Sequence, residues 1–268
     1  MPDTLGYRKR IGIVVPSTNT TVQPECEMLR PHGVTNHTTR STIRERPLNT
    51  EQAFFEHMEM MRGGMTAAID QIMTAGLDHL IIGIALETFW GGVAAAAKLQ
   101  ADLAARAGVG ISMGSTAVVA ALKAFGARRI AVLTPHQLRG DEIVRTYLRE
   151  AGLDVVRLKG LAVTTPRMIA QVSLADIRTA LKELDGPDLE ALLQVGTALP
   201  TVAVARGGTL AWQAGARDQC GDLLACAAAM WHRRSRLRLR KGARRILNFA
   251  GGVAKRRAGA YLVNLYFG

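Results

Sequence analysis

The sequence predicts an α/β protein of two Rossmann-like (flavodoxin-like) lobes with parallel sheets, related by pseudo-twofold symmetry, with an active crevice between them. Short β-branched runs alternate with helical stretches from Arg10 onward. The runs are apolar throughout, which is typical of parallel strands covered on both faces. Two similar units, IGIVVPS and RIAVLTP, each break at a proline. We therefore expect an N-terminal lobe at residues 1–114, a second lobe at residues 115–205, and a crevice at the carboxyl ends of their strands.

Each strand is expected where an apolar run ends at Gly, Ser, Thr or Pro, and each helix in the stretch that follows. The expected strands are Ile11–Val15, Thr35–Thr42, His79–Ile84, Gly110–Met113, Arg129–Thr134, Asp154–Leu161 and Leu189–Val195. The expected helices are Thr20–Leu29, Thr50–Ala75, Gly92–Ala107, Thr116–Phe125, Leu138–Ala151 and Ser173–Leu184.

Composition excludes several classes of protein. Apolar runs such as Leu80–Leu86 are far shorter than the roughly 20 residues that cross a bilayer. The segment Met1–Arg10 lacks the apolar part of a secretory signal, so a cytoplasmic protein is expected. The three cysteines, Cys26, Cys220 and Cys226, have neither a metal-ligand spacing nor the even number of a disulfide framework. We expect no metal and no cofactor.

The net charge of +12 belongs to the end of the chain. Residues 1–205 carry 21 Lys and Arg against 20 Asp and Glu, whereas residues 206–268 carry 13 against two, Asp218 and Asp222. The alternation of strands and helices stops after Ala205, and no clear strand is expected in this basic tail. One interpretation is a disordered basic extension. Nucleic-acid binding through Arg233–Arg245 ranks last, because stacking aromatics do not alternate with these arginines, and no specific nucleic acid is expected as a partner.

A slipped reading frame is the hypothesis that we favour for the tail. Reading one nucleotide later over residues 207–234 allows the peptide EALWRGRPVLAINAATYWHALRQCGIAD. This peptide contains a strand (PVLAIN), a turn and a helix (ATYWHAL), so the alternation that stopped at Ala205 resumes. Sequencing the gene tests the idea.

The predicted crevice receives five loops, and each follows a strand. VPSTNTT at Val14–Thr21 supplies Ser17, Thr18 and Asn19, whose neutral donors suit a carboxylate at a helix start, although the same residues also cap helices. GIALETFWGG at Gly83–Gly92 contains Ile84, Ala85 and Glu87. Glu87 is a candidate general base, or else a helix cap or an ion-pair partner.

The remaining three loops belong to the second half. GSTAVV supplies Ser115 and Thr116, LTPH supplies His136, and QVGTALPT supplies Val195, Gly196 and Thr197. An imidazole titrates near neutrality and donates to carboxylates, so His136 is a second candidate for proton transfer, with an ordinary surface histidine as the alternative.

The motifs in these loops resemble those of the aspartate/glutamate racemase superfamily. VPSTNTT resembles the opening motif of maleate cis-trans isomerases. GSTAVVAALKAFGARRIAVLTPH and GLAVTTPRMIAQVS are similar to arylmalonate decarboxylase. The likeness covers roughly residues 10–205. It implies a cofactor-independent racemase, isomerase or decarboxylase that acts on a small (di)carboxylic acid at the carbon next to a carboxylate. Relatives are commonly dimers or monomers, so a homodimer is compatible with the resemblance.

The resemblance also implies site residues, with one departure. The family's carboxylate cradle transfers to Ser17, Thr18, Asn19, Ser115, Thr116 and Thr197, and His136 stands where relatives often have tyrosine. The two catalytic cysteines of the family align at or beside Ile84 and at Val195. Neither of these side chains can take up or release a proton. Ala85 and Leu86 replace hydroxyl residues of the decarboxylase. Glu87 and His136 remain as the loop residues that can move a proton near pH 7.

Two readings of the function stay open. The first is an isomerase or lyase of this superfamily. The second is a catalytically inactive relative that binds a carboxylate without the cysteine acid/base pair.

Overall fold

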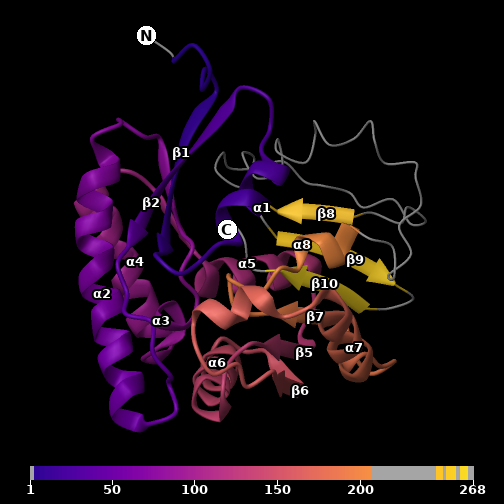
Figure 1. Cartoon of the computed structure of the whole chain (residues 1–268). Helices are drawn as coiled ribbons and strands as arrows, with labels where there is room; N and C mark the ends of the chain where they lie inside the picture. Colours follow the sequence, from indigo (N-terminus) through magenta and orange to yellow (C-terminus); the bar gives the residue numbers. More distant parts are fainter. Residues whose placement is uncertain (1–2, 207–245, 250–251, 258–259, 265–268) are drawn as a thin grey trace.

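The computed structural model describes residues 3–206, 246–249, 252–257 and 260–264, and it has two sheets flanked by helices. In Figure 1 the first half of the chain, in indigo to magenta, lies on the left, and the second half, in pink to orange, lies below and to the right. In the described part of the chain no helix combines the length and the apolar character needed to cross a bilayer.

The first sheet has the strand order β2-β1-β3-β4, and every pair in it is parallel. Its strands are β1 (Lys9–Pro16), β2 (Val34–Ser41), β3 (His79–Ile82) and β4 (Ile111–Met113). Ile13, Val14 and Val15 of the central strand β1 are fully buried, as expected for a strand covered on both faces. All four strands match runs predicted from the sequence.

The second sheet repeats this order in β6-β5-β7-β10 and continues into β9 and β8. Its strands are β5 (Arg129–Thr134), β6 (Asp154–Gly160), β7 (Ala191–Gln194), β8 (Ile246–Phe249), β9 (Gly252–Arg257) and β10 (Ala260–Asn264). Strand β10 is parallel to β7, whereas the β10–β9 and β9–β8 pairs are antiparallel.

The expectation of no strand after Ala205 is wrong for the described residues there. Strand β10 pairs with the edge of β7, and its sequence AYLVN is a short apolar run of the kind that favours strands, which the surrounding arginine blocks obscured. The second sheet is consequently mixed rather than purely parallel. Residues 207–234, on which the frame-slip hypothesis depends, lie outside the described residues.

The helices also follow the prediction closely. They are α1 (Val22–Leu29), α2 (Glu51–Met73), α3 (Leu86–Phe89), α4 (Gly92–Ala107), α5 (Gly114–Phe125), α6 (Leu138–Glu150), α7 (Leu174–Leu184) and α8 (Val202–Arg206), with a 3-10 turn at Arg167–Gln171. Thr50 caps α2 and Ser173 caps α7, because each side chain accepts a hydrogen bond from a backbone N–H of the first turn. The short elements α3, α8 and the 3-10 turn were not predicted, since segments of four or five residues have no measurable periodicity.

The two halves share one hydrophobic core. It contains Met58, Met61 and Met65 of α2 together with Val132 of β5 and Val144 of α6. The Phe89 ring of α3 meets the Tyr147 ring of α6 edge to face, with centroids 4.9 Å apart. The carboxylate of Glu150 in α6 accepts a hydrogen bond from the Val93 N–H at the start of α4. Packing between halves therefore fixes the loops that they present to each other.

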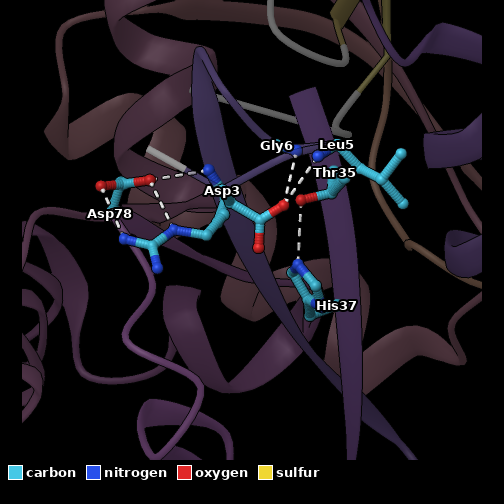
Figure 2. Close-up of polar contacts among 7 residues, drawn as sticks. Asp3, Leu5, Gly6, Thr35, His37 and Asp78 are labelled. Atoms are coloured by element: carbon cyan, nitrogen blue, oxygen red, sulfur yellow. Dashed lines mark hydrogen bonds and ion pairs between the residues drawn. The ribbon is translucent and has the colours of Figure 1, made fainter. Parts of the chain in front are cut away.

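Local polar contacts hold the amino-terminal edge of the first sheet (Figure 2). Asp3 accepts hydrogen bonds from the backbone N–H groups of Leu5 and Gly6. Asp78, just before β3, binds the backbone and the guanidinium of Arg10 in β1. These contacts lie at the edge opposite the carboxyl ends of the strands, so they stabilise the sheet and leave the crevice free.

Candidate functional site

A cavity of about 340 Å³ lies at the carboxyl ends of the strands, and both halves of the chain line it. Segments after β1, β3, β5 and β7 contribute Thr18, Asn19, the run Ile84–Glu87, the run Pro135–Gly140 and the run Gly196–Ala198. Helix α2, the loop before it and the loop after β6 complete the wall. The position agrees with the rule that parallel α/β sheets bind ligands beyond the carboxyl ends of their strands.

Most of the predicted site residues line this cavity. They are Thr18, Asn19, Ile84, Ala85, Glu87, His136, Gly196 and Thr197. Ser17, Ser115, Thr116 and Val195 do not. The Ser17 hydroxyl accepts a hydrogen bond from the Ile43 N–H, and the Thr116 hydroxyl donates to the Met113 carbonyl. Ser115 is fully buried beside Tyr147, and Val195 is fully buried after β7.

Glu87 and His57 are two buried titratable residues that line the cavity. Glu87 is 4% exposed, and its Oε1 lies 3.9 Å from Nε2 of His57, which α2 contributes. Burial raises the pKa of Glu87 to about 7, because water no longer solvates the carboxylate. Burial lowers the pKa of His57, and the Arg46 charge lowers it further. Near pH 7 the pair therefore consists of a half-ionised carboxyl group and a neutral imidazole.

His136 is the third titratable group of the wall. Burial and the nearby His57 lower its pKa to about 4, so its imidazole is neutral at physiological pH. The Thr134 hydroxyl accepts a hydrogen bond from the backbone N–H of His136 and donates one to the buried Asp141 carboxylate. These contacts fix the loop that carries His136. Within the described structure Nε2 of His136 and Nδ1 of His57 are both buried without a hydrogen-bond partner.

Asn19 and Thr197 use their polar groups to join the two halves. The Asn19 side-chain oxygen accepts hydrogen bonds from the N–H groups of Thr21 and Val22, at the start of α1. Its Nδ2 donates to Thr197 Oγ1 at 3.3 Å, and Thr197 Oγ1 donates to the Gly83 carbonyl at 2.9 Å. Asn19 thus holds the turn before α1, whose N-cap residue is Thr21. Thr18 has no such bond within the described residues, so its hydroxyl remains available to a ligand.

The sequence interpretation missed His57 and Arg139. His57 shares the apolar face of α2 with Phe54, Met58 and Met61. A histidine on an apolar helix face was the available signal, but the same pattern is typical of core residues. Arg139 is half exposed near the start of α6, and nothing in the sequence distinguishes it from other helical arginines.

No cysteine of the described residues reaches the cavity. Cys26 is 1% exposed in α1, and burial raises the pKa of its thiol far above neutrality. Cys220 and Cys226 lie outside the described residues. The resemblance predicts the family's two cysteines at or beside Ile84 and at Val195, and of these two residues Ile84 lines the cavity whereas the fully buried Val195 does not.

Comparisons with known proteins agree with this fold. A family model described as arylmalonate decarboxylase matches residues 11–209. Maleate isomerase of Pseudomonas putida (strain KT2440) is 27% identical over 206 residues, which are 72% of this chain and 81% of the relative. The Nocardia farcinica maleate cis-trans isomerase, solved as a mutant with a covalently bound succinylcysteine intermediate, has a TM-score of 0.68 at 19% identity and covers 83% of this chain and 93% of its own. A crystal structure of arylmalonate decarboxylase has a TM-score of 0.54 at 21% identity, with coverages of 74% and 84%.

The fold and the cavity define a two-sheet α/β protein whose pocket is built at the carboxyl ends of both sheets. The family model spans well over half of the residues. The chain belongs to the arylmalonate decarboxylase family.

Proposed function

We propose that the chain is a cofactor-independent enzyme that acts on a small carboxylic acid at the carbon next to its carboxylate, with Glu87 as the proton-transfer group. The observation that carries the proposal is the buried Glu87 carboxylate on the cavity wall, with the His57 imidazole 3.9 Å away. The family and its maleate isomerase and arylmalonate decarboxylase relatives support this class of reaction.

Glu87 has the properties that proton transfer near neutral pH requires. A carboxyl group with a pKa of about 7 is present in comparable amounts as acid and as base. It accepts a proton from the substrate carbon in one form and returns it in the other. His57 is the positioning residue of the pair, since it lies beside the carboxylate and is held neutral by burial.

Exchange and decarboxylation start from different ionisation states of Glu87, so their proton balances differ. In an exchange or racemisation step the Glu87 carboxylate removes the proton from a tetrahedral carbon next to the carboxylate, and the C–H electron pair enters the resulting enediolate. Racemisation requires that the proton return to the opposite face of that carbon, and a cis-trans isomerisation at a double bond does not proceed by this step. In a decarboxylation step the C–C bond breaks, carbon dioxide leaves, and the electron pair again forms an enediolate. In exchange, protonated Glu87 returns a proton to the carbon. In decarboxylation Glu87 starts in its protonated form, donates that proton to the carbon and is reprotonated from water.

The cavity wall favours an acid with an apolar substituent. Ile43, Leu48, Phe54, Met61 and Ile169 line the cavity opposite the polar loops. An aryl or branched alkyl group buries its surface there, at roughly 25 cal/mol for each Å² removed from water. The Thr18 hydroxyl and backbone N–H groups of the loops are then donors for the carboxylate next to the reacting carbon.

A second candidate function is carboxylate binding without turnover. Ile84 and Val195 favour it, because they stand at the positions that align with the thiols of the relatives. Under this alternative the Ile84→Cys/Val195→Cys double variant gains a turnover that the natural chain lacks.

The test is proton exchange at the substrate carbon. The full chain is incubated in D₂O with phenylmalonate, maleate and aspartate, and proton NMR follows product formation and deuterium incorporation. We expect turnover of at least one acid and a loss of about 100-fold or more in Glu87→Gln. The control is Glu59→Gln, which changes an exposed acid of α2 outside the cavity.

Two results distinguish the functions. Binding of an acid without product or deuterium incorporation at any pH contradicts the enzyme proposal and supports the binding alternative. Equal turnover in Glu87→Gln and in the unaltered chain contradicts the role of Glu87.

A further inference from the structure

Two helices begin at the mouth of the cavity and bring one cation to it. The α2 side of the mouth is formed by Asn49, Thr50 and Glu51, and the α6 side by Leu138 and Arg139. Leu138 is 77% exposed, so this part of the wall faces solvent while Glu87 and His57 lie deep inside. Among the described residues that line the cavity, Arg139 is the only lysine or arginine.

Contacts with α2 hold the Arg139 guanidinium in place. Its Nη1 lies 2.8 Å from Oε1 of Glu51. Its central carbon lies 4.4 Å from the centroid of the Phe55 ring and 5.4 Å from that of Phe54. Cation–π contact with two rings restricts an otherwise flexible side chain, so less conformational entropy is lost when it binds a ligand.

No described group that lines the interior carries a permanent positive charge, and the charges of Arg46 and Arg62 act on it from outside the lining. Its titratable groups are Glu87, itself an acid, and two imidazoles, His57 and His136, whose pKa values are lowered by burial. A ligand with two carboxylates therefore places one of them near Thr18 and directs the other toward a permanent positive charge. Within the described wall only Arg139 supplies such a charge.

We propose that Arg139 binds the second carboxylate of a dicarboxylic acid at the mouth of the cavity, and thereby selects dicarboxylic over monocarboxylic acids. The inference deepens the proposed function, on which it rests in taking the ligand to be an organic acid. Glu51 pairs with the Arg139 guanidinium and therefore competes with a ligand carboxylate for it. The side chains of Arg139 and Glu51 are 43% and 69% exposed, so water weakens their attraction and a ligand carboxylate displaces Glu51.

The test compares two ligands that differ by one carboxylate. Isothermal titration calorimetry measures the binding of phenylsuccinate, a dianion at pH 8, and of 2-phenylbutyrate, in which a methyl group replaces the second carboxylate. Neither ligand is a malonate, so decarboxylation does not complicate the titration. We expect phenylsuccinate to bind the full chain more tightly than 2-phenylbutyrate.

Two substitutions should move the affinity for phenylsuccinate in opposite directions. Arg139→Gln is expected to weaken the affinity for phenylsuccinate about 10- to 100-fold, the range for a charge-assisted hydrogen bond. The same substitution should change the affinity for 2-phenylbutyrate less than twofold. Glu51→Gln removes the competitor and is expected to tighten phenylsuccinate several-fold. Arg139→Lys keeps the charge and retains part of the preference.

Arg145→Gln is the matched control, because Arg145 lies on the same helix, pairs with Glu142 and does not line the cavity. It should leave both affinities unchanged. Equal losses for both ligands in Arg139→Gln, or no loss for either, overturn the inference. If the unaltered chain binds neither acid, the inference and the proposed function fail together. If the preference and its loss appear without any turnover, the inference stands and the proposed enzyme activity fails.

Discussion

Asn19 donates a hydrogen bond from Nδ2 to Thr197 Oγ1 at 3.3 Å, so the loop after β1 is bonded to the loop after β7. The two residues lie 178 positions apart in the chain. Thr197 passes the connection on to the Gly83 carbonyl at the end of β3. Three of the loops that surround the cavity are thus joined through one hydroxyl group.

Removing that hydroxyl should destabilise the fold. Thr197→Val keeps the shape of the side chain but leaves the Gly83 carbonyl and the Asn19 amide without their partner. We expect a loss of about 1–3 kcal/mol in the free energy of unfolding, measured with urea. Thr116→Val is the control, since its hydroxyl bonds to a carbonyl three residues away and only partly buried. Losses of the same size in both variants would contradict the linking role of Thr197.

The pH dependence of stability should reveal the buried Glu87 carboxyl. Burial raises its pKa to about 7 from an unfolded value of 4.5, so the folded state binds the proton more tightly. The stability that this tighter proton binding contributes is fully present below pH 4.5 and is lost as the pH rises through 7. Glu87→Gln removes the cost of a buried charge, so at pH 8 it should stabilise the protein on the order of 3 kcal/mol. At pH 5 the effect should be small.

Thermal unfolding at pH 5 and pH 8 measures this difference. Glu59→Gln serves as its control, because that carboxyl group is exposed and should shift the melting temperature little at either pH. A melting temperature of Glu87→Gln below that of the unaltered chain at pH 8 would show that the carboxylate stabilises the fold.

Deuterium incorporation should follow the ionisation of Glu87. The carboxylate form removes the proton, so below pH 7 we expect the rate to rise about tenfold for each pH unit, and to level off above the pKa of about 7. Glu87→Asp keeps the carboxylate but shortens the side chain by one methylene. It should lower the rate and retain the dependence of the rate on pH. A rate that is independent of pH between 5 and 8 would exclude Glu87 as the base.

Gly196 should tolerate no side chain. Its φ is +125°, and a Cβ there would lie 2.4 Å from Cδ of Pro135, so the loops after β5 and β7 meet at this glycine. We expect Gly196→Ala to cost several kcal/mol, because both the backbone and its neighbour must move. Gly126→Ala, with φ of +69° and open space around it, isolates the backbone strain and should cost about 1 kcal/mol. If urea unfolding gives similar losses for Gly196→Ala and Gly126→Ala, the close contact with Pro135 is relieved at little cost.

The reading-frame hypothesis for residues 207–234 stays a prediction. Codons in the gene that are incompatible with the alternative peptide would end the idea.

Most of the fold was predictable because its signals are local. The apolar run of β1 and the long amphipathic face of α2 each lie within one stretch of chain, so periodicity locates them. Strands β8, β9 and β10 were missed, because their short runs lie among blocks of arginine and lysine, and the structure pairs them with one another and with β7. The site follows the same division. Glu87 and His136 were chosen as candidates because they follow strands, and both line the cavity. His57 was not chosen, because it lies on an apolar helix face of the kind that is typical of core residues.

The amino-acid sequence alone determined that strands and helices alternate, that loops rich in hydroxyl groups follow the strands, and that no cysteine lies in those loops. These are properties of neighbouring residues. Packing of the two halves decided that His57 lies beside Glu87, that Asn19 bonds to Thr197, and that Arg139 stands at the mouth of the cavity. A pKa, a hydrogen bond or a charge at a pocket depends on distances through space, and those distances exist only when remote segments fold together.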